Sequence, residues 1–117
     1  MAKIFLDSQV VARIKNALQG QPAKLLLNYN DGVGPYSKVG SCSIGTDFDL
    51  LLAPAQQTLP DYNAQLSSAL GPIFYKKYSA RYLDSDLKLT RGSFNQIQLS
   101  GKGGLIDGSV NIIDERK

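Results

Sequence analysis

The chain has 117 residues, which is enough for one domain with a buried hydrophobic core. Thirteen Lys and Arg residues against ten Asp and Glu residues give a net charge of +3, and the 43% apolar and 20% charged fractions are typical of a globular protein. The sequence contains no histidine and one cysteine, which excludes an intrachain disulfide and a thiolate-built tetrahedral metal site within one chain. We therefore expect a single domain over residues 1–117.

The N-terminal segment predicts neither export nor membrane insertion. Its apolar stretch is too short for a signal peptide, and no window approaches the roughly 18 apolar residues of a membrane span. The net charge of +3 is lower than expected for a dedicated nucleic-acid-binding protein. We expect a cytoplasmic protein with no membrane partner.

The first part of the chain predicts a short strand followed by an amphipathic helix. Residues 3–6 are strand-like, and Asp7 or Ser8 can cap a helix because a side-chain oxygen there accepts a backbone N–H of the first turn. The helix is predicted over 8–19, with Gly20 as its left-handed stop. Its apolar stripe consists of Val10, Val11, Ile14 and Leu18.

The middle of the chain predicts strands separated by long loops. Apolar runs at 25–29 and 48–53 have strand length. Between them, 30–46 is a glycine-rich loop, and long structured loops are often functional. Residues 54–61 predict a second loop, and 62–70 predict one or two helical turns.

The last third alternates with a period of two residues, which indicates strands at 87–90, 94–99 and 110–113. Residues 91–93 suit a tight hairpin, and 100–104, with three glycines, predict a flexible connector. The chain has one glutamate and many β-branched residues and tyrosines, which favours sheet over helix. The predicted fold class is α+β, mainly β.

Two kinds of motif in the loops are better explained as turns than as sites. The glycine segments at 31–35 and 101–104 lack the spacing of a phosphate-binding loop. The carboxylate pairs at 47/49 and 84/86 do not continue as a calcium loop, so we interpret them as turn and solvent-face residues.

The segment 75–82 interleaves tyrosines with the cations Lys76, Lys77 and Arg81, a pattern that also occurs in proteins that bind single-stranded nucleic acid. We favour a half-buried segment in which the tyrosines pack inward and the lysines remain in water. Cys42 is a free thiol in the first loop. We interpret it as an inert small residue, although across a dimer it could supply half of a metal site.

In chain order these segments resemble the A-type iron-sulfur carrier family, also called HesB-like, and in particular its small bacillus and lactobacillus branch. The similarity covers nearly the whole chain. Its most specific part is Ser-x-x-Tyr-Leu-Asp at 79–84 followed by Gly-x-Phe at 92–94. The resemblance implies a HesB-like flattened barrel or two-sheet domain with one N-terminal amphipathic helix, and an association with iron-sulfur cluster biosynthesis. The other matching segments are 4–7 with the helix after it, 25–29, 48–53, Phe74, 87–89 and the alternating residues up to Leu99.

Family members that hold iron or a cluster use one cysteine in the first glycine loop and a Cys-x-Cys pair near the C-terminus, because thiolates suit iron-sulfur centres. By this resemblance Val33, Gly34 and Pro35 occupy the neighbourhood of the first cysteine. Ser109 and Asn111 are the polar residues at thiol-like spacing near the pair. Hydroxyl and amide groups are weaker ligands than thiolates, so the resemblance implies a degenerate, vestigial pocket with no metal and no cofactor.

We therefore predict a non-enzymatic, cysteine-depleted member of the family that acts as a binding or scaffold module through the surface formed by 30–46 and 105–113. We expect a protein partner or self-association. One alternative is a single-stranded nucleic-acid-binding module that uses 75–81 and whose affinity falls with salt. Another is an enzyme that uses Asp and Ser residues of the glycine loop, which would need a carboxylate with a raised pKa in a pocket.

Overall fold

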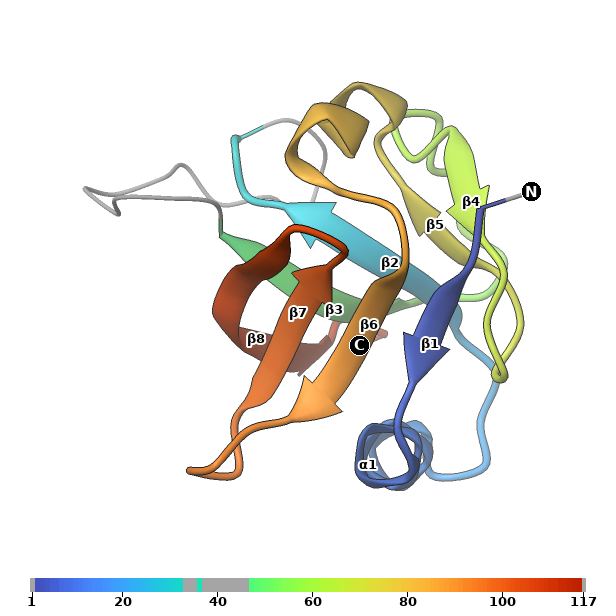
Figure 1. Cartoon of the computed structure of the whole chain (residues 1–117). Coiled ribbons are helices and arrows are strands. Elements are labelled where there is room, and N and C mark those ends of the chain that lie inside the picture. Colours follow the sequence, from blue (N-terminus) through green and yellow to red (C-terminus); the bar gives the residue numbers. More distant parts are fainter. Residues whose placement is uncertain (1, 33–35, 37–46, 117) are drawn as a thin grey trace.

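The structure, a computed structural model, describes residues 2–32, 36 and 47–116. It consists mainly of one eight-stranded sheet with an α-helix packed at one end (Figure 1). A short 3-10 helix, η1, lies between the fifth and sixth strands. The elements in chain order are β1 (Ile4–Leu6), α1 (Ser8–Leu18), β2 (Lys24–Tyr29), β3 (Phe48–Ala53), β4 (Ala64–Leu66), β5 (Ile73–Tyr75), η1 (Lys77–Tyr82), β6 (Leu87–Arg91), β7 (Ile97–Gly101) and β8 (Gly104–Asp114).

The sheet curls into a nearly closed barrel. Its strand order is β1-β6-β7-β8-β3-β2-β5-β4, and an isolated parallel bridge between Lys3 and Ser67 joins the two edges. The long strand β8 connects the two halves, because its first part pairs with β7 and its last part pairs with β3. This architecture confirms the predicted α+β, mainly β, fold class.

The barrel interior and the outer face of β2 and β3 are both packed with apolar side chains. Inner-face leucines of these two strands join α1, which contributes the fully buried Val10 and Ile14. A second cluster covers the outer face and consists of Leu26, Leu51, Ala53, Leu59 and Tyr62. Burial on both faces explains why β2 and β3 are continuous apolar runs rather than alternating ones.

The predicted helix is confirmed together with its cap. The Asp7 side chain accepts a hydrogen bond from the backbone N–H of Val10 at 2.8 Å, and a second oxygen accepts from the backbone N–H of Arg91. At the other end Gln19, with φ of 55°, takes the first left-handed position, one residue before Gly20. Among the described residues no helix is long and apolar enough to cross a membrane.

Three predicted elements are wrong in detail. Residues 64–66 form strand β4 instead of a helical turn, because they pair with β5. The predicted strand at 94–99 begins only at Ile97, since 92–96 form the turn between β6 and β7. Residues 100–104 are a tight hairpin, not a flexible connector, because Gly101 pairs directly with Gly104.

Candidate functional site

The candidate site lies on the outer face of the sheet, where β2, β3 and β8 run side by side. Of the residues predicted for a vestigial pocket, Val33, Gly34 and Pro35 lie outside the described residues, as does Cys42. Ser109 and Asn111 flank the buried Val110 on β8, so their exposed side chains point away from the barrel core.

Strand register brings this part of β8 next to a pair of neighbouring polar positions. Asn111 is the register partner of Asp49 on β3, and Asp49 is in turn the partner of Asn28 on β2. Partners in register share a face of the sheet. The structure therefore brings Asn111 beside a row of polar side chains on the outer face.

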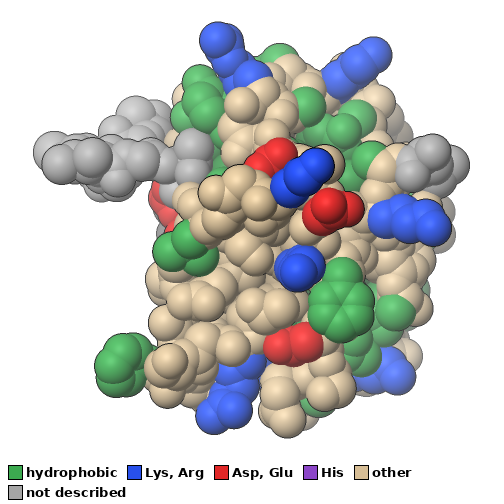
Figure 2. All heavy atoms as spheres, in the orientation of Figure 1, with side chains coloured by type: hydrophobic (Ala, Val, Ile, Leu, Met, Phe, Trp, Pro, Cys, Tyr) green, Lys and Arg blue, Asp and Glu red, His purple; other side chains and the backbone are tan. Residues whose placement is uncertain are grey.

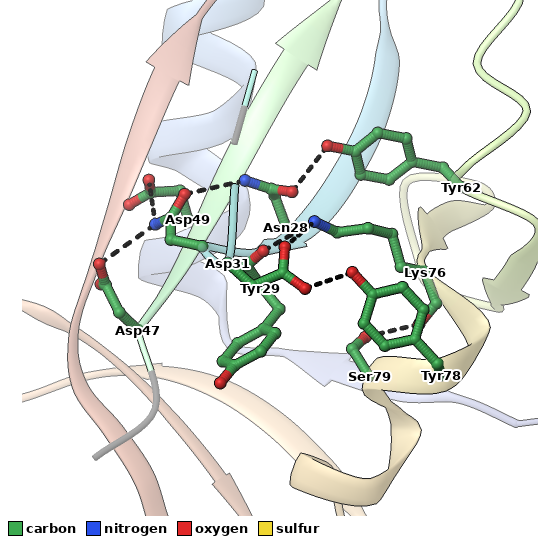
Figure 3. Close-up of polar contacts among 10 residues, drawn as sticks. Asn28, Tyr29, Asp31, Asp47, Asp49, Tyr62, Lys76, Tyr78 and Ser79 are labelled. Atoms are coloured by element: carbon green, nitrogen blue, oxygen red, sulfur yellow. Dashed lines mark hydrogen bonds and ion pairs between the residues drawn. The ribbon is translucent and has the colours of Figure 1, made fainter. Parts of the chain in front are cut away.

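A buried hydrogen-bond network occupies this face, as Figure 3 shows. The Tyr62 hydroxyl donates to Asn28 Oδ1 at 2.6 Å, and Asn28 Nδ2 donates to Asn30 Oδ1 at 3.0 Å. Asn30 Nδ2 then donates to the carboxylates of Asp49, at 2.8 Å, and Asp47, at 3.2 Å. We call these five residues the Asn30 network. Asp49 is buried, so its interpretation as a solvent-face residue is wrong.

A buried cation lies beside the Asn30 network. Lys76 is fully buried, and its Nζ donates to the Tyr29 carbonyl at 2.9 Å and to Asp31 Oδ1 at 2.8 Å. The Tyr78 hydroxyl donates to the other oxygen of Asp31 (Figure 3). The Nζ also lies 5.7 Å from the Tyr62 ring centroid and 6.0 Å from that of Tyr78, within cation–π range. This Lys76 cluster fixes the chain at the exit of β2.

The phenols around these groups are held in their protonated form. Burial raises the pKa of Tyr62, and the negative charges of Asp61 and Asp31 raise it further. The pKa of Tyr78 is raised by desolvation and then by the hydrogen bond to Asp31. Burial and a hydrogen bond with Tyr82 raise the pKa of Tyr29. At neutral pH these phenols act as hydrogen-bond donors, not as general bases.

The basic and aromatic segment at 75–82 does not form the surface that its sequence indicates. We expected Lys76 to remain in water, and this is wrong because it is buried in an ion pair. Lys77 and Arg81 are exposed, and Arg81 lies over the Tyr82 ring at 5.6 Å. The inward packing expected of the tyrosines is also wrong for Tyr78 and Tyr82, which are 48% and 37% exposed. Lys76, Lys77 and Arg81 therefore do not form one basic stripe.

The donor set on this face does not fit an iron-sulfur cluster. The whole chain has one cysteine and no histidine, whereas such clusters bind thiolates and, in some centres, imidazoles. In the part of the chain that the structure describes, no group of three or more metal-ligating side chains is placed to hold an ion, and no buried side-chain nitrogen or oxygen lacks a partner. The carboxylate oxygens of Asp47 and Asp49 are hard ligands, unlike the soft thiolates that a cluster binds, and both side chains already accept a hydrogen bond from Asn30.

Sequence reasoning missed the Asn30 network and the Lys76 cluster. A signal for the first was present, because Asn28 interrupts an apolar strand and a buried amide requires hydrogen-bond partners. For Lys76 no local signal exists, because the carboxylate that pairs with it lies 45 residues earlier in the chain.

Fold and site together define a small, mainly β domain whose outer-face polar residues are bonded to one another. The chain belongs to the iron-sulphur cluster biosynthesis family, whose family model matches residues 2–114. This confirms the resemblance that the sequence carries.

Two solved structures share the fold of this chain. A candidate Fe-S biosynthesis protein from Lactobacillus salivarius, described as having a novel fold, is 31% identical, with a TM-score of 0.85 over 98% of this chain and 99% of that one. A candidate Fe-S biosynthesis protein from Lactobacillus acidophilus is 22% identical, with a TM-score of 0.72 over 96% of this chain and 89% of that one, and it shares the fold. No curated protein matches the chain.

Proposed function

We propose that this chain is a cytoplasmic, single-domain, non-enzymatic member of the iron-sulphur cluster biosynthesis family that acts as a binding or scaffold module and does not itself ligate a cluster. Family membership provides the association with cluster biosynthesis. The proposal that the chain binds a partner without ligating a cluster depends on the Asn30 network, whose polar groups are hydrogen-bonded to one another. This network lies beside β8, the strand that by resemblance would supply the thiolate pair.

The chemistry of that strand supports the proposal. Ser109 and Asn111 offer a neutral hydroxyl and a neutral amide where thiolates would bind iron. Neither group can become an anionic soft ligand at neutral pH, so the affinity of this position for ferrous or ferric iron is low. A single thiol per chain, Cys42, cannot replace three cysteine ligands within one chain.

The same residues argue against catalysis at this position. Acid–base chemistry needs a group that exchanges a proton near neutral pH, and the chain has no histidine. The phenol of Tyr62 is held protonated by burial, and the carboxylates of Asp47 and Asp49 share one amide donor. Carrier-type members of the family are generally not catalysts.

The surface that we assign to binding is formed by 30–46 and 105–113. Within its described part, the apolar side chain of Leu105 is 62% exposed and Ser109 and Asn111 present polar groups. A surface that mixes an exposed leucine with neutral polar groups suits contact with another protein or with a second copy of the chain.

Anaerobic reconstitution with ferrous iron and sulfide tests the proposal. Wild type and Cys42→Ser are desalted and compared by metal analysis and visible absorbance, and we expect no stoichiometric iron in either protein. Ser109→Cys/Asn111→Cys is the matched gain-of-ligand variant, which we expect to retain more iron because both positions face outward on one strand. A wild-type protein that holds stoichiometric iron, and loses it on Cys42→Ser, contradicts the proposal.

A further inference from the structure

The turn between β6 and β7 presents an aromatic side chain to solvent. Phe94 is 91% exposed, more than any other large hydrophobic residue that the structure describes. Figure 2 shows a hydrophobic side chain that projects from the surface at the tip of this hairpin. We call residues 92–96 the Phe94 hairpin. A phenylalanine in water leaves a large apolar surface unburied, which a partner can cover.

The Phe94 hairpin is ordered by hydrogen bonds within the turn. The Gly92 N–H donates to the Gln96 carbonyl at 2.7 Å, and the Asn95 N–H donates to the Gly92 carbonyl at 3.1 Å. The side chain of Gln96 folds under the tip and accepts from the Phe94 N–H at 2.9 Å. A Cβ at Gly92 would lie 2.6 Å from that side chain, so a larger residue there would displace the end of the Gln96 side chain.

Two arginines from different elements brace the tip. Arg91 Nε donates to Asn95 Oδ1 at 2.8 Å, and Arg13 Nη1 of α1 donates to the Asn95 carbonyl at 2.7 Å. Asn95 is held with a positive φ of 64°, which this residue type tolerates better than most. A turn fixed from both sides loses little conformational entropy when Phe94 is bound, which favours tight association.

The same arginines give the surroundings of Phe94 a positive charge. Neither guanidinium forms an ion pair with a carboxylate among the residues that the structure describes. The carboxylate of Asp7 accepts hydrogen bonds from the backbone N–H groups of Val10 and Arg91. An apolar anchor on a turn that two arginines contact is complementary to an apolar pocket rimmed by carboxylates.

We propose that the Phe94 hairpin is a docking element that inserts Phe94 into an apolar pocket rimmed by Asp or Glu on a different protein. A second copy of this chain fits less well. Its shallow surface hollow of about 490 Å³ beside Phe5 is lined by Lys3 and Lys88 with only Asp86 opposing them, so its charge has the same sign as that of the hairpin. In Figure 1 the hairpin lies well away from the C-terminal end of β2, so the proposal is independent of the outcome of iron reconstitution.

The test begins with site-specific crosslinking of the full chain in its own cells. The photoreactive residue p-benzoylphenylalanine replaces Ser93, next to the anchor, or Lys102, at the tip of the β7–β8 hairpin, as a position control. We expect an adduct from position 93 that is lost when Phe94→Ser is added and kept when Phe94→Trp is added. The crosslinked protein is then identified, purified and titrated with the chain by calorimetry.

We expect Phe94→Ser to weaken the purified complex by at least tenfold, since a central aromatic anchor commonly contributes that much. Arg13→Gln should weaken it less and reduce its dependence on salt. Because Phe94 is exposed, Phe94→Ser should unfold at the same urea concentration as wild type. Arg13→Gln provides a second test if Phe94→Ser does not fold.

Four results would overturn the proposal. The first is the absence of any adduct that depends on Phe94. The second is an adduct with another copy of the chain. The third is a purified partner whose affinity does not change with Phe94→Ser and Arg13→Gln. The fourth is sedimentation of wild type, but not Phe94→Ser, with phosphatidylglycerol vesicles, which would identify an anionic membrane as the partner.

Discussion

Replacing Lys76 with methionine removes the buried cation while it keeps most of the apolar length of the side chain. Two charge-assisted hydrogen bonds disappear, one to the Tyr29 carbonyl and one to Asp31. Each such bond contributes about 1.5–3 kcal/mol. The Asp31 side chain is 20% exposed, so water can solvate part of the charge left behind and the lower value applies to each bond. We expect Lys76→Met to lower the free energy of unfolding by about 3 kcal/mol.

Urea denaturation measures this loss. The chain has six tyrosines and no tryptophan, so tyrosine fluorescence and far-UV circular dichroism report unfolding. With a slope of about 1.5 kcal/mol per molar urea, the midpoint should fall by about 2 M. The matched control is Lys77→Met at the exposed neighbouring position, which should change stability by no more than about 0.5 kcal/mol.

A double-mutant cycle identifies the cause. Lys76→Met/Asp31→Asn should be more stable than Lys76→Met alone, because the unpaired carboxylate is then absent. The reasoning is refuted if Lys76→Met costs less than about 1 kcal/mol, or if Lys77→Met costs as much as Lys76→Met.

Three further predictions concern pH and the outer-face network. Backbone N–H groups, chiefly that of Gly103, lower the pKa of Asp84. The ionised Asp84 therefore stabilises the fold above the ordinary pKa of an aspartate, and this stabilisation is lost as pH falls. Thermal unfolding should therefore separate Asp84→Asn from wild type at pH 7 and not at about pH 2. Burial raises the pKa of Tyr62, so the stability that depends on its neutral phenol is fully present below about pH 10 and is lost as pH rises further. An alkaline titration should show its phenolate appearing together with unfolding, later than that of an exposed tyrosine. Asn30→Ala leaves Asp49 without its amide donor and should cost about 3 kcal/mol in urea denaturation, and a cost below about 1 kcal/mol would show that water replaces the amide.

The sequence predicts those parts of the fold whose signal is local. The helical spacing of Val10, Ile14 and Leu18 predicts α1 nearly to its last residue, and the apolar runs predict β2 and β3. It fails at β4, which has three residues and exists because β5 lies beside it. Pairing with a distant strand overrides the weak helical pattern there. It also fails at Phe94, whose aromatic ring suggests a strand. There the backbone N–H groups of Gly92 and Phe94 donate to the carbonyl and the side chain of Gln96, and these bonds build a turn.

In the site, only the positions that the family resemblance locates can be predicted from the sequence. Resemblance locates Ser109 and Asn111, and the structure adds that Asn111 is the register partner of Asp49. The Asn30 network depends on register between strands, and Lys76 depends on the position of η1 against the exit of β2. Neither relation leaves a pattern in adjacent residues, which is why a lysine in a tyrosine-rich segment is naturally interpreted as a surface charge.

The arrangement of polar groups on this barrel connects the two proposals. In a ligand-binding site, the ligating atoms have lone pairs that are available to the ligand. In the Asn30 network each buried oxygen already accepts a hydrogen bond from a neighbouring side chain. Opening that network to bind an ion would leave several buried donors unpaired, each at a cost of about 1–3 kcal/mol. The Phe94 hairpin has the opposite character, because its turn is already ordered while its aromatic ring remains in water. Binding there requires no internal bond to break, so the surface recognition that we propose needs less reorganisation than binding of an ion at the Asn30 network.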